Sequence, residues 1–512
     1  MRRIGIDVGG TNTDAVLVEG AKVVHAVKTP TTEDVTSGVL TALHSLVHGL
    51  GGTAGPVDAV MIGTTHFTNA VVQRRDLMKA AALRIGVPAS ASLPPYIAGP
   101  EDLAEYVNGG VYMVEGGHEF DGRELMPFDA VAVEEAAQAI EESGVRSVAI
   151  SAIFSPLNPA CEDRAAEIIA RLCPGISITK SHDLGRIGLL ERENVALLNA
   201  CLQDLARKTT RAFVDALAES GIDAPLYLTQ NDGTVMLADV AERFPVYSFA
   251  SGPTNSMRGA AFLSGLQDAM VVDVGGTTTD IGFLVNGFPR QANNVVQIGG
   301  VRTLFRMPDL LSVGLGGGTR IHEDPIEIGP DSVGYHLTQE ALVFGGDTLT
   351  ASDIAVASGM TSFGDPAAAH SIDLVLVRQA VEAMKAIMED ATDRMKTDAN
   401  AVPLVAVGGG AFLIPDGMEG VTEVLRVENN AVANAVGAAI AQVSAEVDQI
   451  FNGLGREQAM ARAQKIATDR AVEAGAARET IELVSIEDLP IAYLPGDSLR
   501  VHARVVGDVA GA

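Results

Sequence analysis

Two nearly identical phrases in the sequence combine carboxylates, glycines and threonines in a pattern that suits chemistry on phosphates. DVGGTNTD runs from Asp7 to Asp14, and DVGGTTTD runs from Asp273 to Asp280. Glycine pairs at the end of a strand let the backbone turn sharply and bring its N–H groups to a ligand. Such N–H groups bind anions, and phosphate is the usual one. Two copies in one chain therefore predict a phosphate that is gripped from two sides.

The leading aspartates need a cation if a phosphate binds beside them, because carboxylates and phosphates repel each other. Mg²⁺ is held by one or two carboxylates together with phosphate oxygens, so we expect Asp7 and Asp273 to be metal ligands and catalytic carboxylates for ATP. No GxxxxGK[ST] motif is present, so a P-loop lysine is not the neutralising group. The nucleotide-binding candidates in the phrases are Gly9, Gly10, Thr11, Asn12, Thr13, Gly275, Gly276, Thr277, Thr278 and Thr279.

The repeat extends beyond the eight letters to a whole β-hairpin. RRIGIDV, AVLVEG and KVVHAVK read as three short strands joined by tight turns, and AMVVDVGGTTTDIGFLVNG repeats the order of strand, glycine turn and strand. The alternative is that both phrases are merely tight turns, which favour Gly, Thr and Asp. That reading suits a single copy better than two copies in matching contexts.

The elements around the hairpins alternate between apolar runs and helical patterns, which indicates a mixed α/β fold. Asp129 is the expected N-cap of a helix that ends before Gly144, and a long helix with a buried methionine stripe is expected over 374–396. After about residue 450 the pattern changes to one helix and several strands. We expect an N-terminal half with the acceptor side, a C-terminal half with the nucleotide side, and a small C-terminal appendage, over residues 1–250, 251–445 and 446–512.

The two DxGGT-type hairpins, one opening each half, resemble the actin, sugar-kinase and heat-shock-chaperone ATPase superfamily. AVGGGAFLIP resembles the glycine-rich adenosine loop of that superfamily, and the segments 251–264 and 430–442 resemble its two connecting helices. The resemblance implies two actin-like (ribonuclease-H-like) domains with a nucleotide cleft between them. It adds three residues to the nucleotide-binding candidates, Gly408, Gly409 and Gly410.

Within that superfamily the chain resembles the ATP-dependent hydantoinase/5-oxoprolinase family, which includes subunits of acetone-type carboxylases. The likeness is carried by IGIDVGGTNTD, IGTTHFTNAVVQRR, SGP at 251–253, DVGGTTTDIGFLVNG and SVGLGGGTRI at 312–321. Family members commonly have phenylalanine where Asn12 stands and lack His66, and these departures leave the substrate open. The resemblance implies an ATP-dependent hydrolase, or a hydrolase subunit, that phosphorylates and opens a cyclic amide such as a hydantoin, 5-oxoproline or a lactam. It also favours a phosphate-lining role over a packing turn for Gly316, Gly317 and Gly318.

The acceptor is expected at three loops of the first half that follow predicted strands, 63–69, 155–159 and 231–234. His66 and Asp232 are the candidate acid/base groups, since each can move a proton near neutral pH if its pKa is suitably shifted. Each has a structural alternative: His66 can cap the next helix, and Asp232 can form an Asx turn. Asp232 can also act as the base of a small-molecule kinase, which is one alternative function. An ATPase switch or reactivating factor is the other.

Composition excludes some partners and leaves others open. A net charge of −29 disfavours binding to nucleic acid or to anionic lipid. No apolar run is long enough to span a bilayer. Cys161, Cys173 and Cys201 form no framework and no metal spacing, so we expect reduced core thiols in a cytoplasmic protein. Family members often act with a partner, so we expect an oligomer and leave a second hydrolase subunit open.

Overall fold

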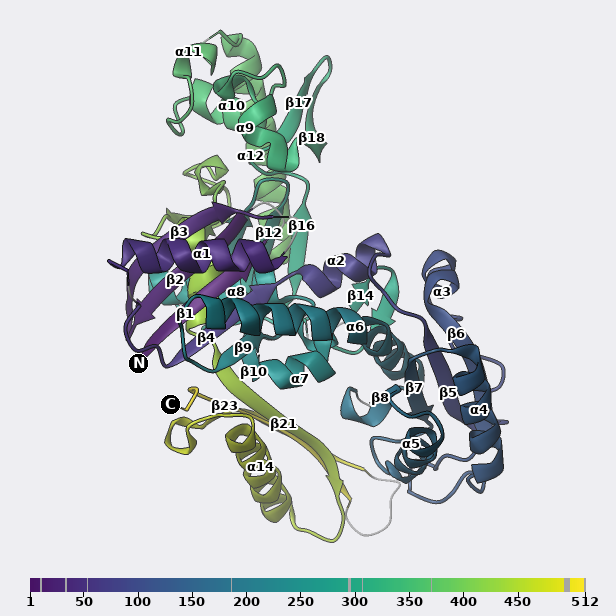
Figure 1. Ribbon diagram of the computed structural model, residues 1–512. Helices are drawn as coiled ribbons and strands as arrows, with labels where there is room; N and C mark the ends of the chain where they lie inside the picture. Colours follow the sequence, from purple (N-terminus) through teal and green to yellow (C-terminus); the bar gives the residue numbers. More distant parts are fainter. Residues whose placement is uncertain are drawn as a thin grey trace.

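The computed structural model describes residues 1–9, 12–32, 35–52, 54–185, 187–292, 296–305, 307–369, 371–491 and 498–510. It contains strands and helices in alternation, which confirms the expected mixed α/β fold (Figure 1). The helices are α1 (Val35–Gly49), α2 (His66–Gln73), α3 (Glu101–Val107), α4 (Ala130–Ser143), α5 (Ala160–Leu172), α6 (Leu189–Glu219), α7 (Ala238–Arg243), α8 (Ser251–Ser264), α9 (Leu337–Glu340), α10 (Ala351–Ala357), α11 (Pro366–Ala369), α12 (Leu374–Met395), α13 (Ala433–Ala439) and α14 (Arg456–Glu473).

A nine-stranded sheet carries the first hairpin, in the order β22-β23-β21-β10-β9-β4-β1-β2-β3. Its strands are β1 (Arg2–Val8), β2 (Asn12–Glu19), β3 (Lys22–Pro30), β4 (Ala59–Thr64), β9 (Leu226–Thr229), β10 (Thr234–Leu237), β21 (Gln442–Phe451), β22 (Glu482–Pro490) and β23 (Leu499–Gly507). The strands that follow residue 442 therefore extend the sheet that the N-terminus begins.

A second sheet carries the second hairpin, in the order β13-β12-β11-β19-β20, with β16 paired to β12. Its strands are β11 (Ala269–Val274), β12 (Thr279–Val285), β13 (Phe288–Pro289), β16 (Leu310–Val313), β19 (Val402–Val407) and β20 (Val421–Leu425). There are two small ribbons among the described residues: β14 (Val296–Ile298) with β15 (Val301–Thr303), which packs on α2 and α6, and β17 (Thr319–Glu323) with β18 (Ile326–Ser332).

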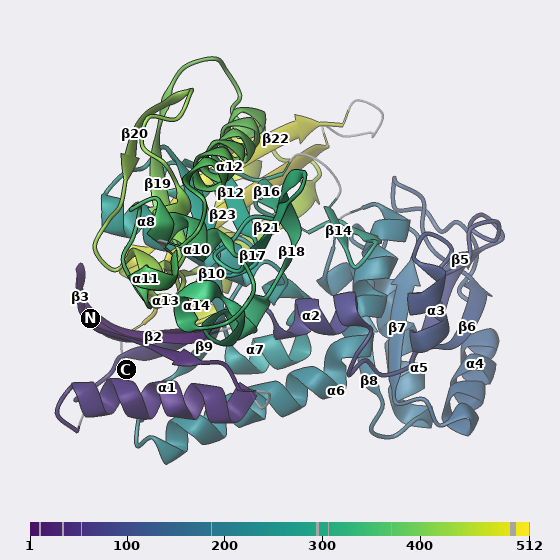
Figure 2. The same ribbon diagram turned by 90° about the horizontal axis from the view of Figure 1, so that it is seen from above.

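A four-stranded parallel sheet, β6-β5-β7-β8, stands apart from the other two sheets (Figure 2). Its strands are β5 (Ala80–Val87), β6 (Asn108–Glu115), β7 (Ser147–Ala152) and β8 (Ser177–Lys180). The long helix α6 links it to the nine-stranded sheet, because α6 packs on α1 at one end and on β7 at the other.

The hairpin strand β1 lies in the core because helices cover both of its faces. Ile4 and Ile6 are fully buried in a cluster that includes residues of α1 and α6. The opposite face, at Gly5, packs on α13, where a Cβ on Gly5 would lie 2.0 Å from the carbonyl oxygen of Ala435. A glycine is therefore required here for the helix to approach the strand.

Several local predictions are confirmed and one segment differs. The Asp129 side chain accepts a hydrogen bond from the Ala132 amide at the start of α4, and Gly144 ends that helix in the left-handed region with φ 73°. The long helix expected over 374–396 is α12. The segment 430–442 is a shorter helix than expected, because α13 spans only Ala433–Ala439 and strand β21 begins at Gln442. The division into units at residues 250 and 445 stays a prediction.

The three cysteines are free and buried, as expected for core thiols. Within the described residues, no helix is both long enough and apolar enough to cross a membrane.

Candidate nucleotide-binding site

The two hairpins share the same backbone pairing. Asp7 lies opposite Asp14 across β1 and β2, and Asp273 lies opposite Asp280 across β11 and β12. The turns close with equivalent hydrogen bonds, from the Gly9 amide to the Asn12 carbonyl (3.0 Å) and from the Gly275 amide to the Thr278 carbonyl (2.9 Å). The sequence repeat is thus a structural repeat. Gly10 and Thr11, at the tip of the first turn, lie outside the described residues.

A glycine near the end of a parallel neighbour strand lies beside each leading aspartate. Gly63, at the end of β4, lies opposite Asp7, and a Cβ there would be 2.8 Å from Asp7 Oδ1. Gly408 follows the β19 residue that lies opposite Asp273, and a Cβ there would be 2.3 Å from Asp273 Oδ1. Both carboxylates therefore sit where a larger neighbouring residue would displace them.

Two packed helices hold the carboxylates in place. Asn434 Nδ2, on α13, donates to Asp7 Oδ2 over 3.1 Å, and Ser256 Oγ, on α8, donates to Asp273 Oδ2 over 2.5 Å. The helices approach closely through glycines: a Cβ on Gly259 would lie 1.9 Å from the carbonyl oxygen of Ala433, and a Cβ on Gly437 would lie 1.8 Å from that of Asn255. The position of each carboxylate is therefore coupled to the helix contact.

Burial and crowding with other carboxylates raise the pKa of both aspartates. Burial is the largest cause for Asp7, whose pKa rises to about 7, and the charges of Asp14 and Asp273 add to it. Burial also leads for Asp273, whose pKa rises to about 6, with a contribution from Asp280. The two leading aspartates thus influence each other across the two halves. The ionised form of each carboxylate is therefore disfavoured, and a nearby positive charge would stabilise it.

The carboxylates fit a bound cation. Asp7 is 5% exposed, and its Oδ1 atom has no hydrogen-bond partner within the part of the chain that the structure describes. Asp14 Oδ1 is also buried and has no hydrogen-bond partner among the described residues. Buried oxygens of this kind are ordinarily satisfied, and a hard divalent cation takes carboxylate oxygens as ligands.

The threonines of the two phrases divide into two groups. Thr13 and Thr279 are fully buried, and their hydroxyls already have partners: Thr13 Oγ1 lies 3.2 Å from Thr31 Oγ1, and Thr279 Oγ1 donates to the Leu315 carbonyl over 2.5 Å. They hold the hairpins together. Thr277 and Thr278, at the second turn, are exposed and free of that role.

The Gly316–Gly318 run packs against the second turn. The Gly317 and Gly318 amides donate to the carbonyls of Gly275 (3.0 Å) and Gly276 (2.7 Å), and the Gly316 amide donates to Thr319 Oγ1 (2.7 Å). All three N–H groups are thus engaged within the protein. This arrangement favours the alternative of a packing turn over direct contact with phosphate.

The Gly408–Gly410 loop follows β19 and lies beside the end of β11, the first strand of the second hairpin. The Gly410 amide donates to the Val274 carbonyl over 2.8 Å, and Gly408 has a φ of 88°, in the region that favours glycine. A Cβ on Gly409 would meet nothing within 4 Å. The loop therefore presents an open backbone at its middle residue, next to Asp273.

The loop 63–69 lies beside Asp7 and contains the first turn of α2. His66 begins α2 and is half-buried, and its backbone amide donates to Thr64 Oγ1 over 3.2 Å. Burial lowers the pKa of its imidazole. Thr68 Oγ1 donates to the Phe249 carbonyl, which ties the loop to the segment before α8. His66 therefore stands at a helix start, three residues after Gly63, the loop residue that lies opposite Asp7.

The loops 155–159 and 231–234 contribute to a separate groove of about 830 Å³ between the four-stranded sheet and β21. The loop 63–69 does not line it, so the three predicted acceptor loops do not share this groove. Asp232 Oδ1 accepts from the amide (3.2 Å) and hydroxyl (2.5 Å) of Thr234, and Asp232 Oδ2 pairs with Arg504 of β23. Asp232 thus forms the Asx-type turn that was its alternative.

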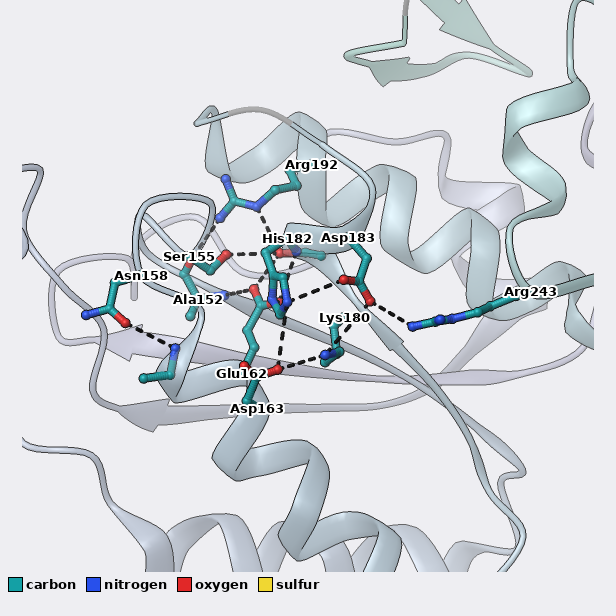
Figure 3. A network of polar contacts seen from close by, with 12 residues as sticks. Ala152, Ser155, Asn158, Glu162, Asp163, Lys180, His182, Asp183, Arg192 and Arg243 are labelled. Atoms are coloured by element: carbon teal, nitrogen blue, oxygen red, sulfur yellow. Dashed lines mark hydrogen bonds and ion pairs between the residues drawn. The ribbon is translucent and has the colours of Figure 1, made fainter. Parts of the chain in front are cut away.

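A buried network at the edge of this groove was not foreseen from the sequence (Figure 3). Glu162 is fully buried and accepts from the Ala152 amide (2.8 Å), Ser181 Oγ (2.5 Å) and the amide (3.0 Å) and Nδ1 (2.7 Å) of His182. Burial works to raise the pKa of Glu162, but the hydrogen bonds from His182 and its charge outweigh it and hold this pKa below its usual range. The partners come from separate strands and helices, so no local motif marks them.

The two hairpin turns with their leading aspartates, Asp7 and Asp273, are called the clamp below. Lys28 is a further charged residue near the clamp, and the sequence alone did not indicate it. It lies opposite Asp14 on β3, and its Nζ is 2.8 Å from Asp14 Oδ2. Its charge acts to lower the pKa of Asp7 and of Asp273. Finding it from sequence requires the β2–β3 register, because fourteen residues separate it from Asp14 along the chain.

Comparison with known proteins places two family models on the chain. One is described as the hydantoinase/oxoprolinase N-terminal region and matches residues 3–173, and the other is described as hydantoinase/oxoprolinase and matches residues 192–362. The chain is 26% identical over 394 residues to the caprolactamase subunit alpha of Pseudomonas jessenii. This alignment covers 71% of this chain and 55% of the relative.

A second relative is the acetophenone carboxylase gamma subunit of Aromatoleum aromaticum, 28% identical over 391 residues, covering 70% of this chain and 53% of the relative. The chain thus spans about half the length of the curated relatives it matches. The crystal structure of the ATP-dependent caprolactamase from Pseudomonas jessenii has a TM-score of 0.79 with 20% identity, covering 99% of this chain and 88% of that chain. This likeness shows a shared fold.

Proposed function

Because the chain belongs to the hydantoinase/oxoprolinase family, we propose that it is an ATP-dependent hydrolase, or the ATP-handling subunit of one, that phosphorylates and opens a cyclic amide. The observation that carries the proposal is the pair of carboxylates, Asp7 and Asp273, presented by matching hairpins. The ATP-dependent lactam hydrolase among its structural neighbours supports the same reaction class.

The proposed chemistry begins with an amide that water attacks slowly. Transfer of the γ-phosphoryl group to the amide oxygen breaks the bond to the β-phosphate, releases ADP and forms an imidate phosphate. Water then adds to the activated carbon, and cleavage of the ring C–N bond in this adduct, with a proton passing to the nitrogen, gives a free amine and an acyl phosphate. A second water cleaves the acyl phosphate to a carboxylate and inorganic phosphate. The protein contributes position and charge stabilisation to these steps.

The residues of the clamp take distinct roles in this proposal. Asp7 and Asp273 hold Mg²⁺, which supplies positive charge to the phosphate oxygens when it is bound. Asn434 and Ser256 orient the two carboxylates through the hydrogen bonds given above. The open backbone near Gly409 suits the nucleoside side, next to the second half.

We propose that the acceptor binds beside Asp7, at the loop 63–69. His66 is the acid/base candidate there, because burial lowers its pKa and so favours the neutral imidazole that accepts a proton. The groove that contains Asp232 is a separate cavity, and Asp232 is committed to Thr234 and Arg504. His66 is therefore the stronger of the two candidates.

Phosphate release from ATP, measured against a panel of cyclic amides, imides and ketones, tests the function. The assay is run with and without the protein encoded by the neighbouring gene, since two relatives are named as subunits. We expect release that depends on a lactam, a hydantoin or 5-oxoproline and that matches the amount of opened ring. A stable phosphorylated product with an intact ring, or release that ignores every ring compound, would contradict the proposal.

A further inference from the structure

The two hairpins differ in the residue that faces their second aspartate. In the first half, Asp14 lies opposite Lys28 on β3, with an ammonium-to-carboxylate distance of 2.8 Å. In the second half, Asp280 lies opposite Ser312 on β16, whose hydroxyl donates to Asp280 Oδ1. The equivalent position is thus cationic in one half and neutral in the other.

Lys28 is placed to meet a ligand as well as its partner. Its side chain is 36% exposed, whereas the side chain of Asp14 is only 6% exposed. An ammonium group has three hydrogen-bond donors, and within the part of the chain that the structure describes Lys28 uses one of them, on Asp14 Oδ2. The group can therefore keep its bond to Asp14 while it donates to an incoming anion.

Electrostatics of the clamp require a fixed positive charge. Asp7, Asp14 and Asp273 are all subject to the charge of Lys28, which acts to lower the pKa of each. A nucleotide polyphosphate adds further negative charge to this group of carboxylates. One divalent cation carries fewer charges than the polyphosphate and these carboxylates together, so a protein cation near the phosphates would lower the electrostatic cost of binding.

We propose that Lys28 binds the terminal phosphate of the nucleotide and so fixes the polyphosphate with its terminal group toward the first half. Asp14 acts as the positioning residue that holds the ammonium at the end of the hairpin. The proposal rests on the proposed function for the identity of the ligand. It adds the direction of the polyphosphate, which follows from the difference between Lys28 and Ser312.

The test measures the affinity of the full chain for ATP and for ADP by calorimetry, in Mg²⁺ and again in EDTA. We expect Lys28→Met to reduce the preference for ATP over ADP by about 10- to 100-fold, the scale of a lost charge-assisted hydrogen bond. Lys28→Arg should keep most of the preference, because it keeps the charge. We expect Lys28→Met to reduce the preference for ATP over ADP in EDTA as well, which would show that the lysine acts on the phosphate without the metal.

Three comparisons separate this role from a structural one. Lys22→Met, at the other end of the same strand, and Ser312→Ala, at the equivalent position of the second half, should both leave the ATP-over-ADP preference unchanged. Lys28→Met leaves Asp14 without its partner, so the double variant Lys28→Met/Asp14→Asn removes the unpaired carboxylate. That double variant should bind ATP as poorly, relative to ADP, as Lys28→Met does.

The outcomes are distinct. Wild-type preference in Lys28→Met, equal loss for ATP and ADP, or recovery of the preference in the double variant would overturn the proposal. A wild-type chain that binds neither nucleotide would overturn this proposal and the nucleotide chemistry together. A wild-type chain that prefers ATP through Lys28 but opens no ring compound would contradict the proposed function alone.

Discussion

Asp7 is a buried carboxyl whose ionisation opposes folding. Its pKa is raised from 3.8 to about 7, so the folded chain holds a proton that the unfolded chain has already lost above pH 4. Below the unfolded value both states are protonated and the carboxyl has no effect. As the pH rises from about 4 to about 7, the folded state is progressively disfavoured, and the loss of stability is complete above pH 7.

This linkage predicts the behaviour of Asp7→Asn without ligand. The amide cannot ionise, so the variant should melt at a higher temperature than the wild type at pH 8, and the gap should close toward pH 4. Melting curves across that range check it. A variant that is less stable than the wild type at every pH would show that ionisation of Asp7 does not destabilise the folded state.

Asp232 carries a different prediction, because it is paired. Arg504 is buried, and Asp232→Asn removes the charge that balances it. We expect a loss of about 1–3 kcal/mol in the free energy of unfolding, measured in denaturant, with nucleotide affinity little changed. The matched control is Asp121→Asn, whose partner Arg123 is largely exposed, so its loss should change the free energy of unfolding much less than the loss of Asp232 does. Equal effects of the two substitutions would contradict the pairing.

At the scale of residues, site residues that belong to the repeated phrase could be predicted from the sequence. Site residues whose position depends on strand register or on helix contacts could not. Asp7 and Asp273 stand out because the same phrase occurs twice. Lys28, Ser256 and Asn434 carry no local signal, because each meets its aspartate through strand pairing or helix contact far along the chain. The sequence also predicts Thr13 and Thr279 as nucleotide-binding residues, although their hydroxyls are buried and have partners within the protein, because sequence does not reveal which way a threonine points within a hairpin.

Among the elements, helices α8 and α13 connect the carboxylates of the two halves. Their contact depends on glycine, since a Cβ on Gly437 would fall 1.8 Å from the carbonyl oxygen of Asn255. The helix axes must separate to admit a methyl group, and Asn434 and Ser256 move with them.

We therefore predict that Gly437→Ala lowers the melting temperature and weakens nucleotide binding together. The lost stability should reach about 2 kcal/mol or more, because overpacking against backbone leaves no room for local relaxation. Gly455→Ala is the control: a Cβ there meets nothing within 4 Å, and its backbone, with φ −63°, suits alanine. A Gly437→Ala chain that melts and binds as the wild type does would show that the helices are not tightly coupled.

The element boundaries were largely predictable, whereas their pairing was not. The hairpin strands, α4 and α12 follow from period, capping residues and glycine turns, all of which are local. That β21 runs parallel to β10 and that β22 and β23 extend the N-terminal sheet follow from contacts between distant segments. The expected appendage therefore has its predicted helix and strands but is continuous with the nine-stranded sheet.

For the whole molecule, a nucleotide that binds both halves should stabilise the native state by mass action. We predict a higher melting temperature with millimolar ATP or ADP and Mg²⁺, and a smaller rise with Mg²⁺ alone. At a ligand concentration 100 times the dissociation constant the gain is about 2.7 kcal/mol. An unchanged melting temperature at millimolar nucleotide would count against a nucleotide site between the hairpins.

The central claim is that the two hairpins form one clamp on one nucleotide. A double-mutant cycle of ATP turnover with Asp7→Asn, Asp273→Asn and the double variant tests it most directly. We predict losses of roughly 10²–10⁴-fold for each single variant, the scale for groups that hold catalytic geometry or stabilise developing charge. The double variant should lose far less than the product of the two, because residues that act as a unit are not additive. Near-normal turnover in either single variant, or a fully multiplicative loss in the double variant, would contradict a single clamp.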